Sequence, residues 1–275
     1  MGSVLAAWQS AHRWEITLLA ALTTILLQVL SNLANDYGDS VHGIDSAERE
    51  GPSRMVQSGA ISMAAMKKAL YLFAFLSLAS GILLLWVAFG DNIRLFLSFL
   101  GLGLLAILAA VTYTAGKKPY GYIGLGDLSV FLFFGLLAVL GTFFLHTGLV
   151  NRLILLPAAS CGFFATAVLN VNNIRDIPSD TKAGKRSIPV MLGRKKAVIY
   201  HWFLLIAGLV TAAVFILLAA TPLTTWAFLL ALPLLLINGL NVGKKDKAAE
   251  LDPYLRQMVL STLVFVLSFS LGLLW

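Results

Sequence analysis

The sequence predicts an all-α protein, a polytopic bundle of membrane helices. Of its 275 residues, 59% are hydrophobic and only 12% are charged, and the mean hydropathy is +0.87. A soluble domain carries roughly a quarter charged residues, about twice this share. The apolar residues lie in runs of roughly 20, the length that a helix needs to cross about 30 Å of hydrocarbon. The alternating segments of about ten residues that a membrane β-barrel needs are absent from the sequence.

Eight segments are long and apolar enough to span a bilayer. They are Trp14–Asn35, Lys68–Ala88, Ile93–Thr114, Leu128–His146, Arg152–Val171, Ala197–Ala219, Thr224–Asn241 and Gln257–Trp275. An even number of crossings places both ends of this chain on the same face of the membrane.

The charged residues divide unequally between the two faces. All basic residues except Arg13, Arg94 and Arg152 fall on one face under this assignment. Lysine and arginine accumulate in cytoplasmic loops, so this face is predicted to be the cytoplasmic one. The same face carries every acidic residue except Glu15 and Asp91, which the charge bias does not require. The net charge of +7 therefore follows from topology and indicates no nucleic-acid partner, and the chemistry is expected at the cytoplasmic face.

The first acidic motif, SNLANDYGDSVHGID, occupies residues 31–45 at the cytoplasmic end of the first span. Four of its polar side chains follow i, i+3, i+4, i+7 spacing and therefore line one face of a helix. These residues are Asn32, Asn35, Asp36 and Asp39. Asp45 follows Gly43, beyond the expected end of that helix.

The second acidic motif, NVNNIRDIPSD, occupies residues 170–180 at the end of the fifth span. Its polar residues again fall near one face, and they are Asn172, Asn173, Asp176 and Asp180. Pro178 disfavours continuation of the helix through Ile177, so Asp180 is expected in a turn or in a new short helix.

The likeness of the two motifs suggests a duplicated four-helix unit, with each unit presenting an acidic end to a central cavity. Carboxylates near a membrane are costly unless they are paired or bind metal. Mg²⁺ is typically held by few carboxylates together with substrate phosphates and water. Two such ends could hold two Mg²⁺ ions that bridge a diphosphate. The alternative is that both motifs are solvated helix ends at the membrane surface.

Three basic segments follow the acidic motifs or lie on the same face: residues 51–59, 116–122 and 182–187. Their arginines and lysines could bind phosphate oxygens and stabilise negative charge as a bond to phosphate breaks. The remaining lysines of that face, such as Lys195 and Lys245, are interpreted as determinants of topology. The sequence contains no Walker A, HExxH or GxSxG motif, and its lone Cys161 forms no internal disulfide.

The motifs NDYGD and NNIRDIPSD resemble the paired Asp-rich motifs of the UbiA superfamily of intramembrane prenyltransferases. Within it they are most similar to the branch that acts on 1,4-dihydroxy-2-naphthoate in menaquinone biosynthesis. That likeness rests on SNLANDYGD, GPSRMVQSG, YTAGKKPYGYIGLGD and NNIRDIPSDTKAGKRS.

The resemblance implies roles for individual residues. One Mg²⁺ would be held by Asn35, Asp36 and Asp39, with Asn32 as a further candidate. The other Mg²⁺ would be held by Asn173, Asp176 and Asp180. The four aspartates of these sets would be the catalytic residues. The diphosphate would face Lys117, Arg175, Lys185 and Arg186, with Arg54 as a further candidate. The aromatic substrate or a developing cation would face Tyr113, Tyr120 and Tyr122, which could equally be interfacial aromatics.

Two departures from the family pattern concern the first motif and the chain length. The broader pattern has a third aspartate four residues after Asp39, whereas this sequence has Gly43 there and Asp45 two places later, as in the naphthoate branch. The family has nine spans, and SVLAAW (residues 3–8) resembles the tail of a missing first helix. Residues 1–275 are therefore expected to form a single integral-membrane prenyltransferase domain with an incomplete N-terminus.

The reaction that the resemblance implies is transfer of a polyprenyl group from polyprenyl diphosphate to 1,4-dihydroxy-2-naphthoate, with loss of the acceptor's carboxylate. The product would be demethylmenaquinone, and the location a bacterial-type inner membrane. Other acceptors, such as 4-hydroxybenzoate or homogentisate, remain open. A divalent-cation transporter is the alternative from another class, although it would need carboxylates near the bilayer midplane at broken helices. A structural membrane subunit would leave both acidic motifs unexplained.

Overall fold

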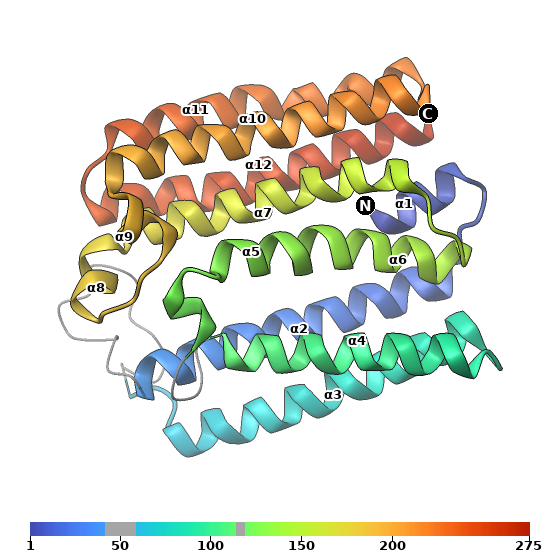
Figure 1. Cartoon of the computed structure of the whole chain (residues 1–275), viewed down its shortest axis with the longest axis horizontal. Coiled ribbons are helices and arrows are strands. Elements are labelled where there is room, and N and C mark those ends of the chain that lie inside the picture. Colours follow the sequence, from blue (N-terminus) through green and yellow to red (C-terminus); the bar gives the residue numbers. More distant parts are fainter. Residues whose placement is uncertain (42–58, 114–118) are drawn as a thin grey trace. The chain divides into compact units, whose positions relative to one another are not determined.

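A computed structural model of the chain describes residues 1–41, 59–113 and 119–275 (Figure 1). Every regular element within these ranges is a helix. Eight helical segments in this part of the chain are long and apolar enough to cross a membrane: Trp14–Gly38, Met63–Phe89, Ile93–Thr112, Gly126–Thr147, Arg152–Arg175, Arg194–Ala219, Leu223–Lys244 and Ala248–Leu274. The predicted all-α class and the predicted number of spans are confirmed.

Some helices begin well before the predicted spans, because polar residues continue the helix beyond the apolar run. The helix predicted from Lys68 begins at Met63, where Ser62 caps it by accepting a hydrogen bond of 3.2 Å from the backbone N–H of Ala65. The last helix begins at Ala248, although the predicted span began at Gln257. The intervening residues include Glu250, Asp252 and Arg256, and Pro253 lies inside the helix, where it leaves out one backbone hydrogen bond.

Residues 13–126 form one compact unit. It contains α2 (Trp14–Val41), α3 (Met63–Phe89), α4 (Ile93–Thr112) and the short 3₁₀ helix η1 (Tyr120–Ile123). α2 and α3 pack against each other, and a hydrogen bond of 2.7 Å joins the hydroxyls of Thr23 and Ser80 inside this contact. Arg13 donates a hydrogen bond of 2.8 Å to the carbonyl of Val87 and so joins the start of α2 to the end of α3.

Residues 1–12 and 127–275 form the second compact unit. Its elements are α1 (Gly2–Trp8), α5 (Gly126–Val130), η2 (Phe131–Leu137, a π-helix), α6 (Ala138–Thr147), η3 (Arg152–Ile154), α7 (Leu155–Arg175), α8 (Ile177–Lys182), α9 (Ile188–Leu192), α10 (Arg194–Ala219), η4 (Leu223–Ala231), α11 (Leu232–Lys244) and α12 (Ala248–Leu274). Buried phenylalanines fill its core, among them Phe164 and Phe265, whose ring centroids lie 4.7 Å apart. The predicted helical character of SVLAAW is confirmed, since α1 packs against α6 and α12 with Leu5 fully buried.

The fourth span, which comprises α5, η2 and α6, packs with the helices that follow it. The predicted four-plus-four repeat places a boundary after this span, whereas the compact units divide before it, between Gly126 and Asp127. The reason is a close backbone contact with α7. A Cβ atom added to Gly135 would lie 2.5 Å from the Cα of Gly162, so only a pair of glycines allows this approach.

Candidate active site

The second acidic motif spans the junction of α7 and α8. Asp176 is the last residue before α8, with a backbone conformation (φ −92°, ψ 7°) outside the helical region, and Pro178 lies in the first turn of the new helix. The carbonyl of Asp176 accepts a hydrogen bond of 2.8 Å from the backbone N–H of Asp180. The predicted break before Pro178 is therefore confirmed, and Asp180 lies in a new short helix.

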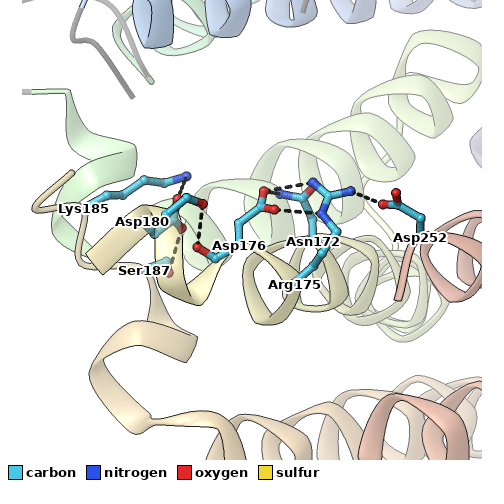
Figure 2. Close-up of polar contacts among 8 residues, drawn as sticks. Asn172, Arg175, Asp176, Asp180, Lys185, Ser187 and Asp252 are labelled. Carbon is cyan, nitrogen blue, oxygen red and sulfur yellow. Dashed lines mark hydrogen bonds and ion pairs between the residues drawn. The ribbon is translucent and has the colours of Figure 1, made fainter. Parts of the chain in front are cut away.

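Arg175 lies between two carboxylates at this junction, as Figure 2 shows. Its Nε and Nη2 atoms donate hydrogen bonds of 2.7 and 2.9 Å to the two carboxylate oxygens of Asp176. Nη2 also donates to Oδ1 of Asn172 at 2.9 Å, and Nη1 donates to Oδ1 of Asp252 at 2.8 Å. The guanidinium is thus engaged by these groups in this structure, and its contact with a diphosphate stays a prediction.

Asp180 is the most deeply buried carboxylate of the motif, with 2% of the residue exposed. Lys185 Nζ lies 3.3 Å from its Oδ1, and the hydroxyl of Ser187 donates to its Oδ2 at 3.3 Å (Figure 2). Burial raises the pKa of Asp180 above its usual range; the ammonium of Lys185 opposes that rise, and the charge of Asp176 adds to it. A cation placed beside this carboxyl would favour its ionised form.

The oxygen donors of this motif fit a Mg²⁺ ion. Asp176 and Asp180 offer carboxylate oxygens, and Asn173, which is also buried, offers an amide oxygen on the last turn of α7. Within the described ranges, no three His, Cys, Asp or Glu side chains gather into a ready-made metal site. Such a set nevertheless suits Mg²⁺, because this ion usually takes few protein ligands and completes its shell with substrate phosphates and water.

The first acidic motif lies on a single continuous helix, as predicted, because α2 extends to Val41. Asn32, Asn35 and Asp36 therefore occupy one helix face by their spacing, and Asp39 follows on this helix, although its side chain lies outside those described. Asn32 accepts a hydrogen bond of 3.1 Å from the side chain of Gln28, and Asn35 and Asp36 are half-buried. That this motif shares a cavity with the second motif stays a prediction. The predicted positions Gly43, Asp45, Arg54 and Lys117 lie outside the described residues.

Two of the three predicted tyrosines form a pair. The rings of Tyr113 and Tyr120 meet edge to face with centroids 5.4 Å apart. The hydroxyl of Tyr120 donates a hydrogen bond of 2.8 Å to the carbonyl of Ala109, and the backbone N–H of Gly121 donates to the carbonyl of Tyr113 at 3.0 Å. Tyr122 is half-buried on the same 3₁₀ turn. The structure brings the side chains of Tyr113 and Tyr120 together, and the proposed contacts of the three tyrosines and of Arg186 with substrate stay predictions.

Sequence reasoning assigned no role to two acidic residues of the second unit. Asp252 pairs with Arg175 across 77 residues of sequence, and no motif marks it. Asp127 begins the fourth span and is 7% exposed, and its Oδ2 atom has no hydrogen-bond partner among the described residues. A carboxylate at the start of an apolar span was the available signal for Asp127, because such a group is expensive there.

Comparison with known proteins bears on this site. Residues 1–273 match the UbiA prenyltransferase family. The chain belongs to this family. It is 46% identical to the 1,4-dihydroxy-2-naphthoate octaprenyltransferase of Haemophilus influenzae, over 99% of this chain and 89% of that one. The proteins of the same name from Escherichia coli and Mycobacterium tuberculosis are 45% and 37% identical, over 99% and 97% of this chain and 88% of each of theirs.

A solved structure, the apo form of a UbiA homolog from Aeropyrum pernix K1, superposes on this UbiA-family chain with a TM-score of 0.71. It covers 97% of this chain and 94% of its own, at 15% sequence identity, and so shows the shared fold. The predicted family is confirmed. The family and these relatives identify the chain as a prenyltransferase, and the eight long apolar helices among its described residues make it a multi-pass membrane protein.

Proposed function

We propose that this UbiA-family chain transfers a polyprenyl group from polyprenyl diphosphate to 1,4-dihydroxy-2-naphthoate. The acceptor loses its carboxylate in the reaction, and the immediate product is the hydroquinone form of demethylmenaquinone, because the transfer removes no electrons from the ring. The observation that carries this proposal is the similarity to octaprenyltransferases of this acceptor over 99% of the chain, at 45–46% identity. Neither another aromatic acceptor nor ion transport is favoured by any of these relatives.

The second part of the proposal is a pair of Mg²⁺ sites. Divalent-metal dependence is general in this family. Asp176, Asp180 and Asn173 would hold one ion, and the donor set described above supports this. The first motif would hold the other ion through Asn35, Asp36 and Asp39, with Asn32 as a further ligand. When bound, Mg²⁺ neutralises charge on a diphosphate and makes it a better leaving group.

Basic side chains would bind the oxygens that the metal leaves uncovered. The contact of the Lys185 ammonium with the carboxylate of Asp180 supports this role for Lys185. Arg186 follows directly, and Arg175, Lys117 and Arg54 complete the proposed set. These cations would stabilise the negative charge that develops on the diphosphate as the allylic C–O bond breaks. Of this set, Lys185 and Arg175 lie beside carboxylates of the second motif while no diphosphate is bound.

The carbon chemistry then needs little from acids or bases of the protein. The C–O bond electrons leave with the diphosphate, and the allylic cation is attacked by the electron-rich ring carbon that bears the carboxylate. Loss of CO₂ returns the bonding electrons to the ring and restores its aromaticity. Tyr113, Tyr120 and Tyr122 are proposed to flank the cation or the acceptor, since aromatic faces attract cations.

We further propose that these groups lie at the cytoplasmic face of a bacterial-type inner membrane. The support is the distribution of lysine and arginine between the two sets of loops. At this face a charged acceptor and a diphosphate reach the site from water, while the polyprenyl chain remains among apolar helices and the lipid bilayer.

The deciding experiment supplies the purified protein with polyprenyl diphosphate and one acceptor at a time: 1,4-dihydroxy-2-naphthoate, 4-hydroxybenzoate or homogentisate. Mass spectrometry should find a prenylated product that has lost CO₂ from the naphthoate alone, and only with Mg²⁺ present. A product from another acceptor alone would contradict the proposed substrate. Metal flux into liposomes without any prenyl transfer would contradict the enzyme assignment itself.

A further inference from the structure

Arg175 carries one buried positive charge that two carboxylates share. Its side chain is 5% exposed, and those of Asp176 and Asp252 are 9% and 28% exposed. Four of the five N–H donors of the guanidinium are used, in hydrogen bonds of 2.7–2.9 Å to Asp176, Asn172 and Asp252. Such charge-assisted pairs are strong where water is scarce, so the position of this guanidinium is well defined.

The surrounding helices fix the distance between Arg175 and Asp252. The residue before Arg175, Ile174, and the residue before Asp252, Leu251, belong to one buried apolar cluster together with Val171. This cluster joins the end of α7 to the start of α12, and the two helices pack along their length. Asp252 therefore acts on Arg175 from a rigid support.

The shared charge has a consequence for Asp176. A metal ion at Asp176 must compete with Arg175, because both cations attract the same two carboxylate oxygens. The carboxylate of Asp252, on the far side of the guanidinium, partly neutralises its positive charge and so weakens the attraction between Arg175 and Asp176. With Asp252 present, the three charged groups sum to −1 and can accept a cation. Without it they sum to zero, and Arg175 is left to Asp176 alone.

We propose that Asp252 is a positioning residue of this site: by holding Arg175 it leaves the Asp176 carboxylate able to bind a divalent metal ion. This inference rests on the proposed function, in which Asp176 is a metal ligand. It adds a residue from the last helix, outside both acidic motifs, to the determinants of metal affinity.

A second ion pair of the same unit provides a matched control. Arg194 contacts Asp246 at 2.9 Å, six residues before Asp252, but the Asp246 side chain is 84% exposed. Asp246→Asn and Asp252→Asn change the net charge equally, and only the second removes a carboxylate from Arg175. A general effect of charge at this end of the helices would appear in both variants.

The test compares full-length wild type with Asp252→Asn, Asp252→Glu and Asp246→Asn in detergent or nanodiscs. Two quantities are measured: the Mg²⁺ concentration for half-maximal prenyl transfer, and Mn²⁺ binding by electron paramagnetic resonance in the presence of inorganic pyrophosphate. Asp252→Asn should weaken both by about tenfold, the range seen for partners of metal ligands, with a smaller change in kcat at saturating Mg²⁺. Asp252→Glu should recover most of the loss, and Asp246→Asn should match wild type.

A double variant keeps the inference testable if Asp252→Asn folds poorly. In an Arg175→Gln background no guanidinium remains to be held, so adding Asp252→Asn should not weaken Mn²⁺ binding further. Equal weakening of Mn²⁺ binding in both backgrounds would overturn the inference. So would an Asp252→Asn variant whose Mg²⁺ and Mn²⁺ constants equal those of wild type while only its melting temperature falls. A wild-type protein that binds no Mn²⁺ and makes no product would instead contradict the proposed function.

Discussion

The ammonium of Lys185, just after α8, lies 3.3 Å from a carboxylate oxygen of Asp180, and the backbone N–H of Lys185 also donates to the Asp180 carbonyl at 2.8 Å. The two residues are therefore held together by main chain and side chain at once. In the absence of a diphosphate, this lysine balances the charge of one proposed metal ligand.

Replacing Lys185 should shift the pH dependence of prenyl transfer. Burial already raises the pKa of Asp180 and Lys185 opposes that rise, so Lys185→Met should raise the pKa of Asp180 further. The ionised carboxylate is the form that binds metal, and activity is lost as pH falls through this pKa. The acidic limb of a pH–rate profile at subsaturating Mg²⁺ should therefore move to higher pH. An acidic limb that stays in place would separate Lys185 from the ionisation of Asp180.

Removal of a proposed metal ligand should abolish transfer without removing the protein from the membrane. Asp36→Ala and Asp176→Ala should each lower kcat/KM by more than about 100-fold, because even outer partners of metal ligands cost 10–100-fold when lost. Lys247→Ala, a change of an exposed lysine in a predicted cytoplasmic loop, should stay within about twofold. Similar losses in all three variants, with membrane content checked by immunoblot, would mean that the site has been misplaced.

Chelation should have a reversible effect. Treatment of the purified protein with EDTA should reduce product formation to background, since the diphosphate would then lack its neutralising ion. Mg²⁺ in excess of the chelator should restore the original rate, while Na⁺ at equal ionic strength should not. Full activity after exhaustive chelation would remove Mg²⁺ from the mechanism.

The glycine contact between η2 and α7 should be sensitive to a single methyl group. Gly135→Ala places a Cβ atom 2.5 Å from the Cα of Gly162, so the helices must move apart at an estimated cost of roughly 1–3 kcal/mol. Gly141→Ala in α6 meets only the end of Leu137 at 3.9 Å and should keep or slightly raise stability, because alanine favours helices. The measurement is the melting temperature of the Gly135→Ala and Gly141→Ala variants in the same detergent. Equal melting temperatures would show that this contact tolerates more volume than its geometry indicates.

Much of the fold could be read from hydropathy and local chemistry. Apolar runs located eight spans, the spacing from Asn32 to Asp39 fixed one helix face, and Pro178 marked the end of α7. The start of α12 was missed because its first turns contain charged residues. Hydropathy detects the apolar part of a helix that can lie in the membrane, and it does not detect polar turns that extend the helix beyond that part. The sequence pattern also did not predict which helices pack together, since the fourth span packs against the later helices through the contact of Gly135 with Gly162.

The site was predicted only where its residues are neighbours in sequence. Asp176 and Asp180 lie in one motif with Arg175, so their proximity followed from a few residues of chain. Asp252 joins them from 77 residues away, and only the packing of α12 against α7 brings it there. The sequence around Asp252, which is charged and contains a proline, does not indicate that this carboxylate pairs with an arginine.

Asp176 is the C-cap of α7 and the N-cap of α8, so Asn173 and Asp180 of the second motif lie in different helices, with this single residue between them. In an unbroken helix the 3.6-residue turn would fix the direction of the Asp180 side chain relative to α7. The break at Asp176 removes this constraint. Substitutions in the loop that contains Lys185 and Ser187 should therefore be able to move the Asp180 carboxylate, and with it the proposed contact to a diphosphate, without changing the packing of α7.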